Sequence, residues 1–308
     1  MSENDYSREY NLGFHKEPDD SLAGRILRGS IDMHVHCQPD LLPRRQNAVA
    51  EVMMAREMGL RGLVFKNPCY PTMPLADLAS RLVPGIAVFG GICLEYECGG
   101  LNPYAVETAA KLGAKVVWMP TFSSANSINL VNRLVKLGIK GEGLSILEKD
   151  GKIVSEVIDI LRIIKDHEMV LATGHISARE TIELVEKAKQ IGITKILVTH
   201  AWFPILMESI LTPEERKMLA TEGVMIEYTL AQISPIGQGL NPKQIMDSIY
   251  NEGVANCIMS TDSGLALQSP AAESMRLFIS NMLWCGMGEE EITQMVKTNP
   301  ARLLGISD

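Results

Sequence analysis

The chain has 308 residues, of which 46% are hydrophobic and 21% charged, a balance typical of a folded globular protein rather than a disordered one. Its 37 acidic and 29 basic side chains give a formal net charge of −8, which argues against a nucleic-acid partner and against binding to a membrane surface, since both need a basic face. The polar N-terminus has no apolar signal core and the six cysteines form no CxxC pair, so we expect a cytoplasmic protein with reduced thiols.

From the N-terminus onward, residues 1–30 are predicted to form an arm and residues 31–308 a single domain. Eight short apolar runs recur along that domain, and most are nearly continuous in apolar residues, which is typical of parallel strands buried on both faces. The runs are residues 31–36, 60–67, 86–95, 115–122, 169–177, 195–202, 224–230 and 257–264.

Helical patterns separate these runs. They cover residues 48–58, 103–112, 154–167, 178–191, 213–222, 242–252 and 271–284, and Thr212 before Pro213 is a predicted N-cap. Eight strand–helix units of about 31 residues match the size of a (β/α)8 TIM barrel, the α/β fold that we expect. An open doubly wound sheet is the alternative, but it would carry a glycine-rich loop after its first strand, where this chain reads HVHCQPD.

One segment is longer than a minimal barrel needs. Residues 123–168 separate the fourth and fifth predicted strands, and Asp150-Gly151 between apolar residues predicts a hairpin there. Long excursions of this kind usually cover a site, although a structural flap or a contact surface fits the sequence equally well.

Histidines and an aspartate stand at the C-terminal ends of the predicted strands, which form the active face of such a barrel. His34 and His36 end the first strand, and because residues i and i+2 point to the same side, both imidazoles are predicted to face the barrel axis. By the same reasoning Asp32 would lie one step deeper and orient a ligand histidine. The fifth, sixth and eighth strands end in His175, His200 and Asp262, and nitrogen and oxygen donors without a thiolate suit zinc, manganese, iron or nickel.

This constellation resembles the amidohydrolase superfamily of metal-dependent hydrolases, from about residue 31 to the end of the chain. The resemblance rests on DxHxH in the first strand, on single histidines ending the fifth and sixth strands, and on the aspartate ending the eighth. It implies one or two divalent ions, zinc before the other metals, and a metal-activated water. His34, His36 and Asp262 would bind one ion, while His175 and His200 would bind a second, or His200 would polarise the substrate.

One departure from the family leaves the number of ions open. Many two-metal members bridge their ions with a carboxylated lysine or a glutamate at the end of strand four, and VVWMPTF has neither. Lys66, which ends the second strand, is the nearest substitute, followed by Glu95 at the end of the third. The alternative for Lys66 is a free cation that binds a substrate carboxylate or a glutamate, because an ammonium is not buried without a partner.

Candidate substrate-binding residues lie in the loops and at the end of the seventh strand. Arg44 and Arg45 are predicted to bind a carboxylate or phosphate, and one of Glu227 and Tyr228 should face inward. Trp202 and Phe203 could form an apolar wall, and Ser123 and Ser124 are weaker candidates. For at least one arginine the alternative is a solvated position in the next helix.

The expected activity is hydrolysis of a C–N or C–O bond in a small molecule (a cyclic amide, amide, lactone or ester), with Asp262 as general base and acid. The same ligands also serve decarboxylases, hydratases and phosphoesterases, and a metal-binding barrel without catalysis is the alternative outside the enzymes. A homo-oligomer is compatible with the 17 methionines, although methionine mostly fills cores.

Overall fold

The computed structural model describes residues 20–235 and 237–306. Its strands are β1 (Ile31–Val35), β2 (Gly62–Phe65), β3 (Ala87–Phe89), β4 (Gly91–Cys93), β5 (Val116–Trp118), β6 (Val170–Ala172), β7 (Ile196–Val198), β8 (Met225–Thr229) and β9 (Cys257–Ser260). All neighbouring strands pair in parallel, in the orders β1-β2-β3 and β4-β5-β6-β7-β8-β9. Each of the eight predicted runs is confirmed as a strand.

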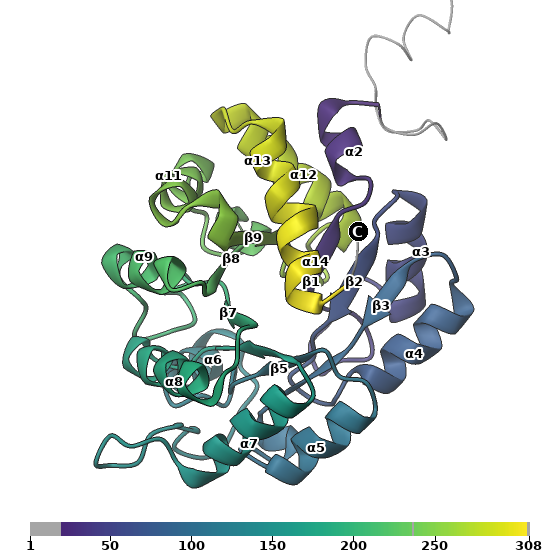
Figure 1. Cartoon of the computed structure of the whole chain (residues 1–308). Helices are drawn as coiled ribbons and strands as arrows, with labels where there is room; N and C mark the ends of the chain where they lie inside the picture. Colours follow the sequence, from purple (N-terminus) through teal and green to yellow (C-terminus); the bar gives the residue numbers. More distant parts are fainter. Residues whose placement is uncertain (1–19, 236, 307–308) are drawn as a thin grey trace, which may run out of the picture.

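The two sheets form one ring with eight strand positions. β3 and β4 belong to a single predicted run, which is interrupted at Gly90. A side chain at this position would clash, because the backbone nitrogen of Met73 lies 2.6 Å from where a Cβ of residue 90 would stand. At the other seam, Val35 and Ser263 form a parallel bridge, and the amides of Asp262 and His36 donate to His34 and Ser263. The predicted barrel is therefore confirmed (Figure 1).

Helices surround the ring and follow the strands along the chain (Figure 1). They are α2 (Leu22–Leu27), α3 (Ala48–Glu57), α4 (Met73–Leu82), α5 (Pro103–Lys111), α6 (Ile128–Leu134), α7 (Ser155–Asp166), α8 (Ala178–Ile191), α9 (Pro213–Thr221), α10 (Leu230–Ile233), α11 (Pro242–Glu252), α12 (Ala271–Cys285), α13 (Glu289–Thr293) and α14 (Asn299–Leu304), with 3-10 turns η1 (Tyr96–Cys98) and η2 (Val254–Asn256) and a π-helical turn η3 (Gln294–Thr298). The seven predicted helices are confirmed, and the Thr212 side chain caps α9 as predicted.

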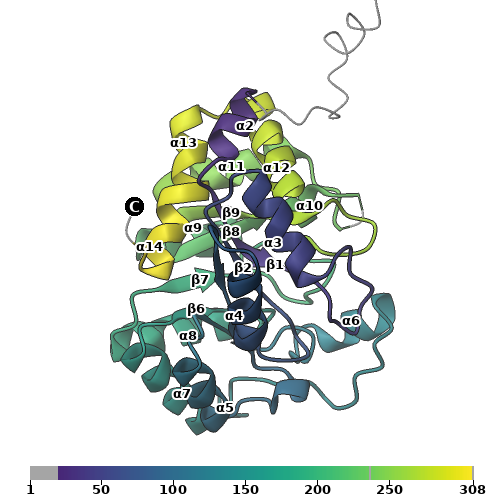
Figure 2. The same cartoon turned by 90° about the vertical axis from the view of Figure 1, so that its right-hand side faces the viewer.

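Side chains fill the barrel interior from its N-terminal end. Ile31, Met33 and Trp118 belong to this inner cluster, and Ala301, Leu303 and Leu304 of α14 close it from below. Figure 2 shows α14 and α6 at opposite ends of the barrel, so the open end lies on the side of α6, where the strands end.

Two parts of the chain extend the barrel. Of the predicted N-terminal arm, residues 1–19 lie outside the described residues, while residues 20–30 contain α2, which packs on α12 with Ile26 and Leu27 buried. The excursion at 123–168 contains α6, the barrel helix α7 and the predicted hairpin, in which Leu147 and Ile153 pair across the turn. Within the described part of the chain, no helix has the length and apolar character that crossing a membrane requires.

Candidate metal centre

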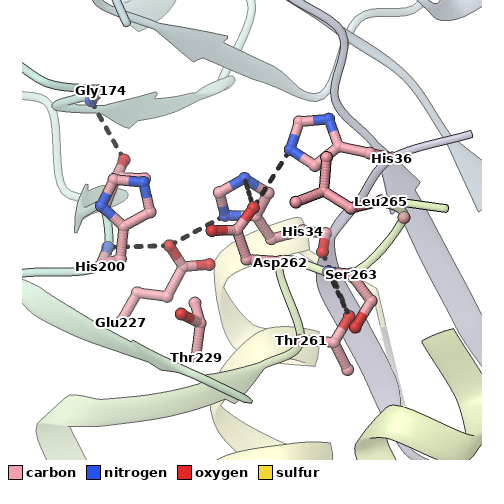
Figure 3. A network of polar contacts seen from close by, with 12 residues as sticks. His34, His36, Gly174, His200, Glu227, Thr229, Thr261, Asp262, Ser263 and Leu265 are labelled. Atoms are coloured by element: carbon pink, nitrogen blue, oxygen red, sulfur yellow. Dashed lines mark hydrogen bonds and ion pairs between the residues drawn. The ribbon is translucent and has the colours of Figure 1, made fainter. Parts of the chain in front are cut away.

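The end of β1 carries two histidines that face the open end of the barrel. Ile31 and Met33 point into the barrel interior, but the pairing of β1 with β2 shifts register between Asp32 and Val35. After this shift His34 and His36 face inward, and both lie beside Asp262 in Figure 3. The prediction that the two histidines share one side is confirmed.

The same register shift places Asp32 elsewhere than expected. Its carboxylate accepts hydrogen bonds from the Thr261 hydroxyl at 2.6 Å, from the Thr261 amide at 3.1 Å and from the His34 amide at 3.1 Å. No histidine ring contacts it among the hydrogen bonds of the described residues. Asp32 therefore ties β1 to the end of β9 and positions His34 through the backbone, and the expected contact with an imidazole is wrong.

Three donor atoms meet at the ends of β1 and β9. His34 Nε2 and His36 Nε2 each lie 3.2 Å from Asp262 Oδ1, and all three donor atoms lie within 4.8 Å of one another. Ligands bound to one zinc ion at about 2.0–2.1 Å are about 2.9–3.4 Å apart, depending on the bond angle. The two histidine–aspartate separations are thus those of neighbouring ligands around one ion. Asp262 itself has a backbone φ of 51°, a strained conformation that is most common at functional sites.

His175 and His200 lie next to these three residues. Their Nε2 atoms face each other at 3.1 Å, and the His200 ring stacks on that of His34 with 5.6 Å between centroids. His200 Nδ1 is buried without a hydrogen-bond partner among the described residues. All four predicted histidines and the aspartate therefore come together, although residues 34 and 262 are far apart in sequence.

Two partners determine which ring nitrogens are free to bind an ion. The Ser127 hydroxyl donates its proton to the carbonyl of Leu206, so it accepts from His175 Nδ1, at 2.9 Å. Glu227 Oε2 accepts from His34 Nδ1 at 3.2 Å and from the His200 amide at 3.0 Å. With their Nδ1 atoms protonated, His175 and His34 present lone pairs on Nε2, which is the form that ligates a metal.

Burial keeps these groups in the protonation states that a metal site needs. It lowers the pKa of His36 to about 3, helped by the charge of Arg44, and that of His200 to about 4, and it lowers the pKa of His175 well below its usual range. Burial alone would raise the pKa of Asp262, but the surrounding imidazoles outweigh it and hold that pKa well below its usual value. Neutral imidazoles and an ionised carboxylate are the species that bind a divalent cation.

An open cavity of about 530 Å³ lies over these groups. Its polar lining includes His36, His175, His200, Asp262, Arg44, Lys66, Thr121 and Gln268, and its apolar walls include Phe122, Phe203, Leu206 and Leu265. Leu134 of α6 and the adjacent Val135 also line the cavity. The long excursion therefore covers part of the site, which is the first of the interpretations given for it above. A volume of this size suits a small-molecule substrate.

The two arginines of the loop after β1 have different surroundings. Arg44 lines the cavity; its Nε donates to Asp40 at 2.8 Å and its Nη2 lies 3.4 Å from His36 Nδ1. Arg45 is exposed and donates to the carbonyl of Ala266 at 3.4 Å, outside the cavity lining. The expectation of a substrate contact is therefore corrected for Arg45, which takes the solvated alternative.

The end of β8 also separates two predicted substrate contacts. Glu227 faces inward, as one of the pair should, but it is fully buried beneath the histidines and does not line the cavity. Tyr228 points to the outer layer, where its hydroxyl donates to Glu252 at 2.6 Å. Neither side chain is placed to contact a substrate, so both expectations are corrected: Glu227 orients His34, and Tyr228 packs between β8 and the helices.

The remaining candidates divide between the cavity and its supports. Glu95 does not bridge the centre, because it accepts the amides of Thr121, Phe122 and Ser123 at 2.7, 3.1 and 2.7 Å and so holds the loop after β5. Phe203 lines the cavity, whereas Trp202 packs against Arg216 behind it.

Sequence reasoning missed Ser127, which orients His175, and Asn126, which ties the same loop to the carbonyls of His175 and Ser209. Ser124, a weak candidate for substrate binding, instead donates to the His175 carbonyl at 3.0 Å. The one sequence signal at this place is the polar run SSANS after a buried strand.

Comparisons with known proteins agree with this architecture. Similar solved structures include a probable dipeptidase, PvdM, from Pseudomonas aeruginosa (TM-score 0.61, 11% identity, covering 92% of this chain and 96% of that one), an amidohydrolase from Pseudomonas aeruginosa (0.60, 12%, 92% and 97%) and N-acetyl-D-glucosamine-6-phosphate deacetylase from Mycobacterium smegmatis (0.58, 16%, 91% and 76%). At these identities the likeness shows the fold alone, and the chain shares the barrel fold of these structures, as the resemblance implied. A search of the curated proteins found no match.

A family model matches residues 29–227, which contain six of the eight strand positions in full, part of a seventh (β8), and the four candidate ligand histidines. This match spans well over half of the 308 residues. The chain therefore belongs to DUF6282, which is described as a family of unknown function.

Proposed function

We propose that this protein is a metal-dependent hydrolase that cleaves a C–N or C–O bond in a small cyclic amide, amide, lactone or ester. The observation that carries the proposal is the arrangement of His34, His36 and Asp262. Their donor atoms have the separations of neighbouring metal ligands, and two of the three residues, His36 and Asp262, line an open cavity.

The residues present fit a divalent ion. His34 Nε2 is buried with no hydrogen-bond partner among the described side chains, and the Nε2 lone pairs of His34 and His175 are fixed by partners on their other nitrogens. His34, His36 and Asp262 would hold one ion, while His175 and His200 would hold a second or bind the substrate carbonyl. We propose zinc, with manganese, iron or nickel as alternatives for the same donors.

A bound divalent ion would supply a water with a pKa near 7 and a polarised scissile bond. The side chains of the protein transfer the proton and hold the substrate. Asp262, kept ionised by the imidazoles around it, accepts the proton of the attacking water and delivers it to the leaving group. Phe122 and Phe203, which line the cavity, provide apolar contact for the substrate.

The test is an activity screen of metal-reconstituted protein on esters, lactones and amides, with Asp262→Asn beside the wild type. We expect Asp262→Asn to lower turnover by about 10²–10⁴-fold, the usual contribution of a general base. Asp77→Asn, a change of the same chemistry in an exposed pair with Arg81 on α4, serves as the control and should keep full activity. Equal turnover in all three proteins would exclude Asp262 from the mechanism, and no hydrolysis by the wild type would contradict the proposal.

A further inference from the structure

Lys66 is a buried cation in the lining of the cavity. It directly follows β2, two residues after Val64, whose side chain faces the barrel interior. Only 3% of the surface of Lys66 is exposed. It lines the cavity together with His175 and His200, whose pKa values its charge helps to lower.

The ammonium of Lys66 has no anionic partner among the side chains that the structure describes. Among the ion pairs of residues 20–235 and 237–306, none involves Lys66, and its Nζ lies 5.8 Å from the centroid of the Trp118 ring. The other cation of the cavity, Arg44, is instead neutralised by Asp40, whose side chain is fully buried. Since burying an ammonium alone is costly, the cavity has a place beside Lys66 for an anion that residues 20–235 and 237–306 do not supply in an ion pair.

The neighbouring aromatic ring bears on the chemical state of Lys66. The face of an indole carries negative charge and attracts a cation, whereas it would repel the anionic carbamate of a carboxylated lysine. The contact with Trp118 therefore favours the ammonium form over the metal-bridging form.

We propose that Lys66 binds a carboxylate of the substrate, so that the substrate class is a small carboxylic acid derivative with an apolar body. The single charge of Lys66 complements a single carboxylate, and the body would lie against Phe122, Phe203 and Leu206. The inference rests on the proposed function in one respect, namely that this cavity is the substrate site.

Calorimetric titration with two matched probes tests the proposal. Phenylacetate carries the anionic group and phenylacetamide is its neutral counterpart, and each is titrated into metal-loaded protein and into protein treated with a chelator. In Lys66→Met, which keeps an apolar stem, we expect phenylacetate to bind about tenfold more weakly or worse, as for the loss of a charged hydrogen bond. Binding of phenylacetamide and the metal content should not change.

Lys140→Met is the control, because it removes an equal charge from an exposed position in the neighbouring cavity. It should bind phenylacetate like the wild type. Three results would overturn the proposal: unchanged phenylacetate binding in Lys66→Met, loss of metal from Lys66→Met, which would make Lys66 a ligand, or tighter binding of inorganic phosphate than of phenylacetate to the wild type.

The two proposals fail separately. Suppose that the metal-loaded wild type hydrolyses none of the substrates, while the binding of phenylacetate still depends on Lys66. The hydrolase function is then wrong and the carboxylate site stands. If hydrolysis is found but is equally fast with neutral and carboxylate-bearing substrates in wild type and Lys66→Met, the function stands and the substrate class is wrong.

Discussion

Replacing Ser127 by alanine removes the group that fixes the orientation and tautomer of His175. The hydroxyl is fully buried, donates to the Leu206 carbonyl and accepts from His175 Nδ1 at 2.9 Å. In Ser127→Ala, Nδ1–H has no acceptor, which costs about 1–3 kcal/mol in the free energy of unfolding. Removing such a partner of a ligand histidine also weakens metal binding by about 10–100-fold, or about 1.4–2.8 kcal/mol.

The neighbouring serine provides a matched control for this prediction. Ser124 is equally buried, but its hydroxyl donates to the backbone carbonyl of His175, not to the ring. Ser124→Ala should therefore lose a similar amount of stability in urea unfolding while keeping wild-type affinity for zinc in competition with a chromophoric chelator. If Ser127→Ala binds every ion as tightly as Ser124→Ala does, the reasoning about His175 is refuted.

Three further changes test the supports of the site. Gly264 has a φ of 146°, and a Cβ there would lie 2.2 Å from the His36 carbonyl oxygen, so Gly264→Ala should lower stability by about 1–3 kcal/mol and weaken zinc binding. The control Gly113→Ala, at φ 88° but with open space around the new Cβ, should lower stability alone. Equal zinc binding in the two variants would contradict this reasoning. Glu252→Gln removes the anionic partner of buried Arg216, whose Nε donates to Glu252 at 2.6 Å. The variant should lose about 3–5 kcal/mol in the free energy of unfolding, measured in urea, without a change in metal affinity. Zinc at 100 times its Kd should add about 2.7 kcal/mol of stability, seen as a higher Tm, and an unchanged Tm would argue against the site.

The strands and most helices could be predicted because each leaves a local pattern. Nearly continuous apolar runs marked β1 to β9, and a proline after a polar cap marked the starts of α5, α9 and α11. The sequence pattern did not predict α2, α4, α6, α10, α13 and α14. Of these, α4 (Met73–Leu82) begins inside the proline-rich segment KNPCYPTMP, which is typical of a loop, although Pro74 stands in its first turn. The convergence of the five candidate ligands followed from the barrel alone, because strand ends meet at one rim.

The sequence did not predict features that depend on which side of a strand a residue faces, or on contacts between residues far apart in the chain. The register shift in β1 reverses the expected side of Asp32, and no residue pattern announces such a shift. Glu227 and Tyr228 are adjacent in β8, where one faces inward and the other outward, and the depth of the inward one depends on side chains from other strands. Ser127 acts on His175 from 48 residues away, through a loop with no regular period.

The central claim is that His34, His36 and Asp262 share one divalent cation. A crystal structure of zinc-loaded protein, with anomalous diffraction measured on both sides of the zinc absorption edge, tests it most directly. We predict an anomalous peak about 2.0–2.2 Å from His34 Nε2, His36 Nε2 and an oxygen of Asp262. A peak bound to other residues, or no peak at this place in protein saturated with zinc, would contradict the claim.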